Sequence, residues 1–299
     1  MNNIQVNFSI KDLENLTGIK AHTIRIWEKR YNLLSPDRTD TNIRNYNLSS
    51  FQKLLNISYL NNNGLKISKI AKLKEEEIPI KVREIASRAK VEDHAINALK
   101  MAMINFDQVL FYNTYKNLIE TKTFSDIFYT VFLPLLNEIG LLWQTNTITP
   151  AHEHFVSVHI KQKILLNIER IQSLEPKPES KTCILFLPDH EIHDIGLLFL
   201  NYELRSKGYH TIFLGSSVPM DSLVDLHEFF NEITFISYFT VYPEVEKIPE
   251  YIAEFDSTLL LKENTKFMIL GPKLAEVKDL KLPKNVATYD SIEKLVKAF

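Results

Sequence analysis

The spacing of apolar residues changes along the chain and divides it into segments. Between residues 6 and 75, short helical patterns flank a polar, hairpin-like middle. Residues 80–173 carry apolar positions three and four apart, the period of amphipathic helices, and four helices fit this length as a bundle. Beyond residue 181, apolar runs alternate with helical stretches, which predicts a parallel, doubly wound sheet. The predicted strands are 183–187, 211–214, 235–238, 267–270 and 286–288.

Breaks in composition set the predicted boundaries. An acidic run followed by Pro79 ends the first segment, and a stretch rich in Pro and Glu at 173–180 precedes the α/β segment. We therefore predict a multidomain protein of α and α/β classes, with domains at 1–78, 79–174 and 181–299.

Charge distinguishes the first segment from the rest. Residues 1–75 hold 12 Lys or Arg and 6 Asp or Glu, a net charge of +6. The whole chain has a formal net charge of -2, so the remainder carries -8. A basic head on an acidic body favours nucleic-acid binding, although an ordinary solvated surface can give the same bias.

Other features limit the class of protein. Cys183 is the single cysteine, which excludes a disulfide framework and a cysteine metal cluster. The most apolar run, 127–136, is too short to span a bilayer, and the first ten residues do not resemble a secretory signal. We predict a cytoplasmic protein without membrane contact.

Two helix signals surround a tight turn near the N-terminus. Ser9 is placed to cap a first helix, and Gly18 lies in the turn that follows it. Residues 21–30 form the predicted second helix, with Ile24 and Trp27 on its buried side. This arrangement is typical of a helix-turn-helix.

Residues 23–31, together with 34–38 and 44–46, resemble the winged-helix signature of the MerR family. The resemblance implies double-stranded operator DNA as a partner, with base and phosphate contacts from the second helix and the wing. The residues that it implies are His22, Thr23, Arg25, Arg38, Arg44 and Tyr46.

A histidine follows the first predicted strand of the α/β segment. His193 would lie at the carboxyl end of a parallel sheet, where such folds bind ligands. Glu191 can orient its imidazole, and Gly196, which has no Cβ, lets a flat cofactor approach the backbone. An isolated loop histidine is more often a surface residue, so this pattern alone leaves both readings open.

The pattern Glu-x-His-x-x-Gly at 191–196 resembles the cobalamin-binding signature, which implies that His193 is the lower axial ligand of cobalt. Ser237 and Gly271 match the later serine and glycine of that signature and imply contact with the buried nucleotide tail. Phe239 and Pro272 depart from the signature and put tail binding in doubt.

A second motif lies in the helical segment. Trp143, Glu153 and His154 have the Trp-x9-Glu-His spacing of the CarH/LitR light-sensing repressors. The resemblance implies that they cover the upper face of adenosylcobalamin, whereas a lone tryptophan in a bundle is otherwise a core residue. Gln144 replaces the histidine that captures cobalt after photolysis in photosensing members, which puts that light-adapted state in doubt.

These resemblances cover nearly the whole chain and imply a MerR-type winged helix-turn-helix, a four-helix bundle and a flavodoxin-like (Rossmann) cobalamin-binding domain. They imply a repressor that binds adenosylcobalamin between the bundle and the α/β domain. In that family, the adenosyl form drives assembly, usually to a tetramer that blocks a promoter, and light loosens the assembly and releases the DNA. For this chain we predict a homo-oligomer, a dimer or a tetramer.

Two alternatives belong to other classes. One is a MerR-type regulator that keeps the cobalamin-binding fold but responds to another ligand or a partner protein. The other is a corrinoid enzyme, which we disfavour because a mutase barrel of roughly 250 residues has no room beside a DNA-binding head.

Overall fold

The computed structural model describes residues 7–38, 42–86, 91–144, 147–177, 181–277 and 280–299. The chain divides into two compact units, Met1–His159 and Ile160–Phe299, which are described separately.

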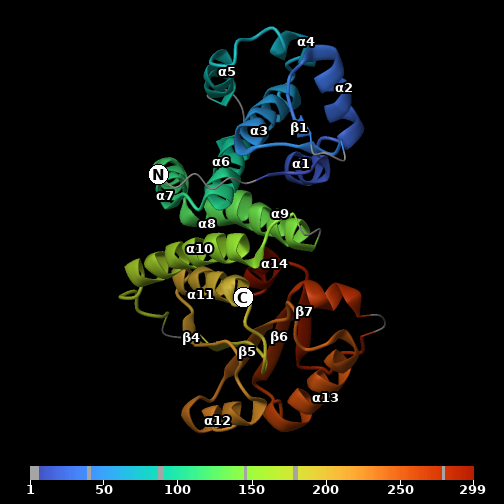
Figure 1. The fold of residues 1–299 in the computed structure, drawn as a ribbon. Coiled ribbons are helices and arrows are strands. Elements are labelled where there is room, and N and C mark those ends of the chain that lie inside the picture. The colour runs from blue at the N-terminus through green and yellow to red at the C-terminus, as the bar shows by residue number, and fades with distance from the viewer. Residues whose placement is uncertain (1–6, 39–41, 87–90, 145–146, 178–180, 278–279) are drawn as a thin grey trace. The chain divides into compact units, whose positions relative to one another are not determined.

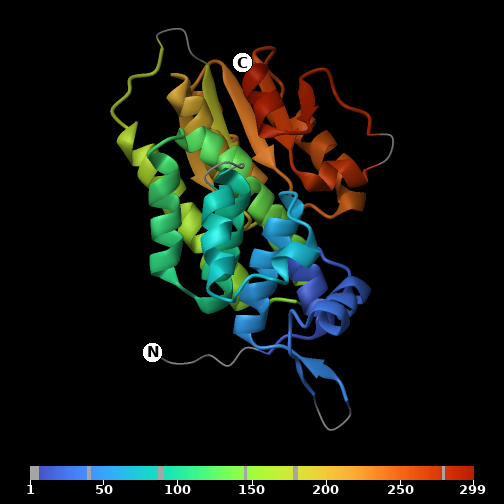
Figure 2. The ribbon, with the colours of Figure 1, turned by 90° about the horizontal axis from the view of Figure 1, so that it is seen from above.

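The first unit begins with a helical head that carries a two-stranded hairpin. In α1, the Ser9 hydroxyl accepts a hydrogen bond from the amide of Asp12 (3.2 Å), and the helix ends at Gly18 in the left-handed region (φ 74°). The predicted cap and turn are thus confirmed. The hairpin projects from the helices (Figure 2). The elements are α1 (Ile10–Thr17), α2 (Ala21–Tyr31), β1 (Asp37–Arg38), β2 (Arg44–Asn45), α3 (Leu48–Asn62), α4 (Ile67–Ile70) and α5 (Glu77–Ala86).

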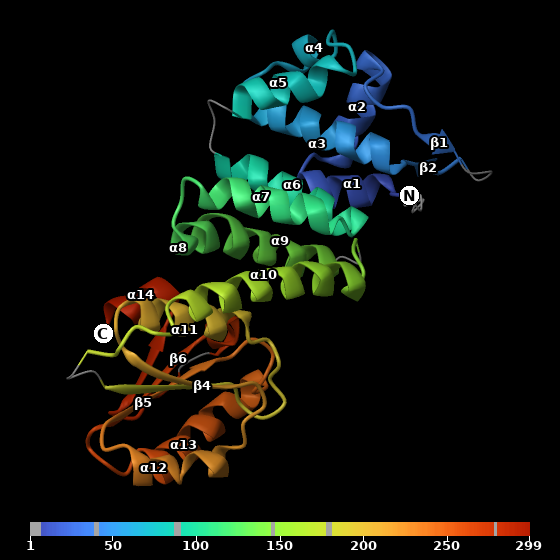
Figure 3. The ribbon, with the colours of Figure 1, turned by 90° about the vertical axis from the view of Figure 1, so that its left-hand side faces the viewer.

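A helical bundle follows the head. Its helices run side by side in Figure 3, and α5 packs against α3 of the head. The bundle core is apolar because the three-and-four spacing brings side chains such as Leu99, Phe111 and Ile139 to buried positions. Its elements are α6 (Val91–Asn105), α7 (Gln108–Ile119), α8 (Phe124–Ile127), η1 (Phe128–Phe132), α9 (Leu133–Gln144) and the first part of α10 (Pro150–Arg170).

Three of these elements form one continuous helix. The stretch Phe124–Leu142 is the one segment among the described residues that is long and apolar enough to cross a membrane by length and composition. Its side chains at Ile127, Val131 and Leu135 are fully buried in the bundle. A core helix of a bundle passes the same test, and the burial of these side chains agrees with that role.

The second unit is an α/β domain around a parallel sheet of order β4-β3-β5-β6-β7. Helices α11 and α14 cover one face, and α12 and α13 cover the other (Figure 1). The five predicted strands and the flavodoxin-like class are confirmed. The elements are β3 (Thr182–Phe186), α11 (Ile195–Ser206), β4 (His210–Gly215), η2 (Met220–Leu223), α12 (Leu226–Phe229), β5 (Ile233–Tyr238), η3 (Val245–Lys247), α13 (Ile248–Leu259), β6 (Thr265–Leu270), η4 (Pro272–Glu276), β7 (Val286–Tyr289) and α14 (Ile292–Lys297).

Candidate functional site

His193 lies in the loop between β3 and α11, at the carboxyl edge of the sheet, and half of its side-chain surface is exposed (50%). Its Nδ1 lies 2.6 Å from Oε1 of Glu191, whose side chain is completely buried. Because an ionised carboxylate only accepts hydrogen bonds, Nδ1 carries a proton, and in the neutral imidazole Nε2 is then the nitrogen with the lone pair. This tautomer suits an imidazole that binds a metal through Nε2.

Glu191 also joins this loop to the one after β5. Its Oε1 accepts hydrogen bonds from the amides of Ile192 and His193, both at 2.9 Å. Its Oε2 accepts from three consecutive amides, those of Thr240 (3.2 Å), Val241 (2.6 Å) and Tyr242 (2.8 Å). One side chain therefore holds the histidine loop and the neighbouring loop together.

The hydrogen bonds also explain how a charge is tolerated in the interior. Burial raises the pKa of the Glu191 carboxyl, but the hydrogen bonds from His193 and from the amides of residues 242, 241 and 193 outweigh burial and lower the pKa to about 2. Glu191 is therefore ionised at neutral pH and orients His193 as predicted.

The Trp143 motif spans the connection between two helices of the first unit. Helix α9 ends at Gln144 and α10 begins at Pro150, as predicted from the first-turn preference of proline. Glu153 lies in the first turn of α10, and its Oε1 accepts a hydrogen bond from Ser157 Oγ (2.5 Å). His154 is exposed, and the side chain of Trp143 lies outside the described residues.

The second helix of the head presents a polar face. His22 and Arg25 are exposed on α2 and Thr23 is half-buried, whereas Ile24 and Trp27 are buried, as predicted. Arg38 is exposed on β1, where its Nη1 donates a hydrogen bond to Asn42 Oδ1 (2.5 Å).

Two other predicted DNA contacts belong to an internal network. Tyr46 is fully buried, and its hydroxyl donates a short hydrogen bond to Glu28 of α2. Burial and this hydrogen bond raise the pKa of Tyr46 above its usual range. Arg44 Nε donates to the other oxygen of Glu28 (2.9 Å). Through Glu28, the buried Tyr46 connects the end of the hairpin to α2, and its contact with DNA stays a prediction.

Comparisons with known proteins agree with this architecture. Residues 8–77 match the family described as MerR HTH family regulatory protein, and residues 95–166 match the family described as B12 binding domain. This chain joins a MerR helix-turn-helix domain to a B12-binding domain. The prediction of a transcriptional regulator rather than an enzyme is confirmed by this combination.

Two repressors of Myxococcus xanthus are similar to most of the chain. The HTH-type transcriptional repressor CarH is 27% identical over 222 residues, which cover 72% of this chain and 73% of the relative. The HTH-type transcriptional repressor CarA is 28% identical over 218 residues, which cover 72% and 70%. The chain is thus a distant homologue of these proteins.

A solved structure shares the fold. The monomethylamine corrinoid protein of Methanosarcina barkeri has a TM-score of 0.58 and 14% identity, over 69% of this chain and 97% of that one. This likeness supports the arrangement of a helical region followed by an α/β domain.

In the α/β domain, His193 and Glu191 fit the metal of a cobalamin, whereas the space at Gly196 does not fit a flat part of this cofactor. His193 and Glu191 have the chemistry of a metal ligand and its support. Ser237 is completely buried, and its hydroxyl has no hydrogen-bond partner within the part of the chain that the structure describes. The position that lacks a Cβ at Gly196 is filled by the ring of Tyr238.

Gly271 serves the packing of the sheet. It has a φ of 124°, and a Cβ there would lie 2.6 Å from the backbone nitrogen of Phe239. The space at the Cβ position of Gly271 is thus filled by the chain's own backbone. Only glycine meets both the conformation and the spacing at this position.

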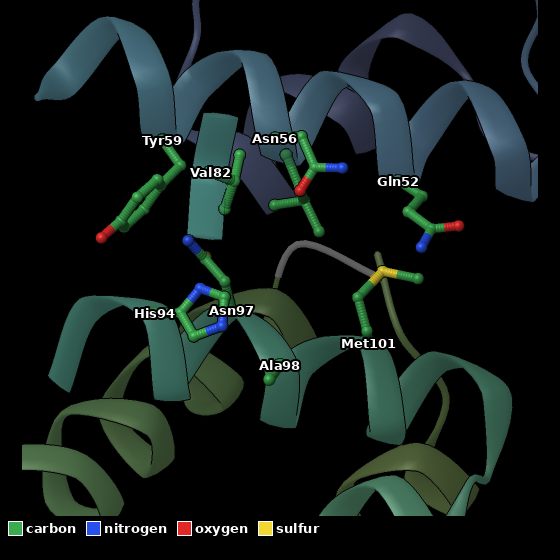
Figure 4. Close-up of a pocket in the computed structure, with 9 residues that line it drawn as sticks. Gln52, Asn56, Tyr59, Val82, His94, Asn97, Ala98 and Met101 are labelled. Carbon is green, nitrogen blue, oxygen red and sulfur yellow. The ribbon is translucent and has the colours of Figure 1, made fainter. Parts of the chain in front are cut away.

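A small cavity lies in the first unit between α3, α5 and α6 (Figure 4). Its volume is about 90 Å³, and burial lowers the pKa of His94 on its wall. An apolar cavity of about 150 Å³ holds a benzene molecule, so this one is far too small for a corrin. It therefore does not compete with the His193 loop as a corrinoid site.

Two features of the site were not predicted. The amides of Thr240, Val241 and Tyr242 are backbone groups, so the side chains at these positions do not predict their hydrogen bonds to Glu191. Tyr238 could have been found, because a strand alternates its side chains and the residue after Ser237 must point to the opposite face, towards α11.

Proposed function

We propose that this chain is a transcriptional repressor whose B12-binding domain takes a cobalamin and couples the state of the cofactor to operator binding. The observation that carries the proposal is the buried Glu191 carboxylate, which fixes the tautomer and orientation of His193. The descriptions of both relatives as repressors support the direction of regulation. A regulator that acts on DNA works inside the cell.

In this proposal, His193 ligates the cobalt and Glu191 retains the proton on Nδ1. Adenosylcobalamin, when bound, supplies a cobalt–carbon bond that light can break. Trp143, Glu153 and His154 would make further contacts with the cofactor, as their resemblance to the CarH/LitR motif implies. The loaded chain assembles as a dimer or tetramer on its operator, and illumination weakens that assembly.

The residues of the head have two roles, contact with DNA and support of the wing. His22, Thr23 and Arg25 contact DNA from α2, and Arg38 contacts phosphate from the wing. Arg44 and Tyr46 act through Glu28, to which both are hydrogen-bonded, and so hold the wing against α2.

The experiment uses the full chain and two histidine variants. The protein is mixed with adenosylcobalamin in the dark, and its visible spectrum, size and operator affinity are measured before and after green light. We expect His193→Ala to lose the shifted corrinoid spectrum while operator binding by the cofactor-free protein is retained. His190→Ala is the matched control, because His190 is exposed, lies three residues away and has its side chain beside Asp189.

Different results reject different parts of the proposal. A wild-type chain that binds no corrinoid rejects the cofactor. A chain that binds it but shows the same size and operator affinity before and after illumination rejects the coupling to light.

A second function has specific support. The Tyr238 ring at Gly196 and the replacement of histidine by Gln144 favour a regulator that keeps this fold but acts without cobalamin. Operator binding that is unchanged by corrinoids and by His193→Ala supports this second function.

A further inference from the structure

Tyr238 occupies space that the sequence otherwise leaves open for a ligand. Gly196 is the second residue of α11, and a Cβ there would lie 2.7 Å from Cε2 and 2.8 Å from Cζ of the Tyr238 ring. Such distances are shorter than van der Waals contact, so the ring lies directly against the glycine backbone. The ring of Tyr238 thus occupies the space that a Cβ at Gly196 would take.

The ring is a packed part of the domain. Tyr238 is the last residue of β5, and burial raises the pKa of its hydroxyl. Because side chains alternate along a strand, Ser237 and Tyr238 point to opposite faces of the sheet. The contact with Gly196 shows that Tyr238 takes the face covered by α11.

The neighbouring positions are closed as well. Ser237 is completely buried, and the space beside Gly271 is filled by the backbone of Phe239. His193, in contrast, exposes half of its side chain at the same edge of the sheet. At this edge, the half-exposed imidazole of His193 therefore lies in the same region as two glycine positions that the chain's own atoms fill.

We infer that Tyr238 is a specificity-determining residue that weakens binding of the nucleotide tail, so that the domain favours corrinoids that lack this tail. The inference rests on the proposed function, since it concerns the ligand of His193. Gly196 is the glycine of the cobalamin-binding signature, where a flat ligand group would come close to the backbone, and such a group competes with the Tyr238 ring for that space.

The test compares two corrinoids with the full chain. Aquocobinamide lacks the nucleotide and hydroxocobalamin carries it, and binding of each is followed by visible absorption. Free cobalamin also coordinates its own base, so the deciding quantity is how the ratio of the two dissociation constants changes between variants. We expect Tyr238→Ala to strengthen cobalamin binding about tenfold to a hundredfold, which is the change in affinity that corresponds to the free energy of burying one large side chain. Cobinamide binding by this variant should stay within about threefold of the wild-type value.

Three variants control this experiment. Tyr238→Phe keeps the ring and should keep the wild-type ratio. Tyr238→Leu removes the ring but retains an apolar side chain, which covers the case in which the alanine variant does not fold. Tyr209→Ala removes a ring just before β4, at the opposite edge of the sheet, and should leave both dissociation constants unchanged.

The outcomes separate this inference from the proposed function. An unchanged ratio in both Tyr238→Ala and Tyr238→Leu overturns the inference while cobalamin binding stands. Failure of wild type and both variants to bind either corrinoid overturns the proposed function and the inference with it. Cobalamin binding that is weaker in wild type than in these two variants, with cobinamide binding alike in all three, supports both.

Discussion

Glu191 is a buried anion that is solvated by protein instead of water. A carboxylate with no exposed surface is costly unless several donors surround it. Here one oxygen receives the imidazole and two amides, and the other receives three amides of the next loop. The residue therefore contributes to stability and to the orientation of His193 together.

The depressed pKa of Glu191 predicts a loss of stability in acid. The folded pKa of about 2 lies below the ordinary value of 4.5, so the stabilisation is present above about pH 4.5 and is lost as the pH falls towards 2. The difference corresponds to about 3 kcal/mol. We expect Glu191→Gln to unfold at a lower urea concentration than wild type at pH 7. Between pH 5 and pH 3, the variant should lose less free energy of unfolding than wild type does.

The acid dependence distinguishes the charge from simple packing. Asp189→Asn is a suitable control, because Asp189 is an exposed carboxylate of the same loop. If wild type and Glu191→Gln lose stability in parallel as the pH falls, the carboxylate is not the group that titrates.

The contact between Gly196 and Tyr238 predicts an energetic coupling. Gly196→Ala places a methyl group against the ring and should destabilise the domain by about 1–3 kcal/mol, even though alanine is the better helix former. In a Tyr238→Ala background the same change should cost little. A double-mutant cycle in urea measures the difference, and additive effects of the two changes would contradict the contact.

Helix α2 and the hairpin of the head are joined by one acidic side chain. Glu28 of α2 receives hydrogen bonds from Arg44 and Tyr46, which flank the end of the hairpin. Two short strands of two residues each do not hold a hairpin in place by themselves. The position of the wing therefore depends on this network.

Arg38 and Tyr46 should respond differently to salt. Arg38→Ala removes an exposed cation, so the log–log slope of operator affinity against salt should become shallower by about one. Tyr46→Phe removes a buried hydroxyl, which should cost about 1–2 kcal/mol of stability without changing that slope. Fluorescence anisotropy at several salt concentrations checks both, and a changed slope for Tyr46→Phe would place it on the DNA.

At the level of elements, the sequence predicted more of the α/β domain than of its loops. Strand positions were predictable because apolar runs are dictated by burial, and His193 could be placed because it follows such a run. The π-helical turn η1 was not predicted. Pro134 follows it closely and cannot donate to the carbonyl four residues before, and a widened turn accommodates that loss.

The contacts between the loops were less predictable, because many of them are made by backbone groups that are the same for every residue type. Glu191 was expected to orient His193, but the three amides that it also binds are the same in every sequence. The contact of Tyr238 with Gly196 depends on which face of the sheet each residue at the end of β5 takes, and the signature residues Ser237 and Phe239 do not specify it. The backbone contact at Gly271 likewise depends on the path of the chain after β5.

Charge is distributed unevenly along the chain. Residues 1–75 carry +6 and the remainder -8, so attraction to DNA is concentrated in the head and the rest of the chain repels phosphate. Operator affinity of the full chain should therefore fall steeply with salt, with a slope of about -0.9 for each phosphate neutralised. Titrations between 50 and 200 mM salt measure this slope. An affinity that stays flat would exclude binding through phosphates.

The ion pair between Lys161 and Asp194 has a consequence for domain exchange. Lys161 belongs to α10, and its Nζ lies 2.5 Å from a carboxylate oxygen of Asp194, the residue next to His193. The B12-binding match ends at residue 166 and so includes Lys161, whereas Asp194 lies beyond it. A chimera that transplants the α/β sheet from residue 181 onward would leave this partner behind. Successful grafting onto another regulator should therefore carry the end of α10 along with the sheet, as one inherited piece.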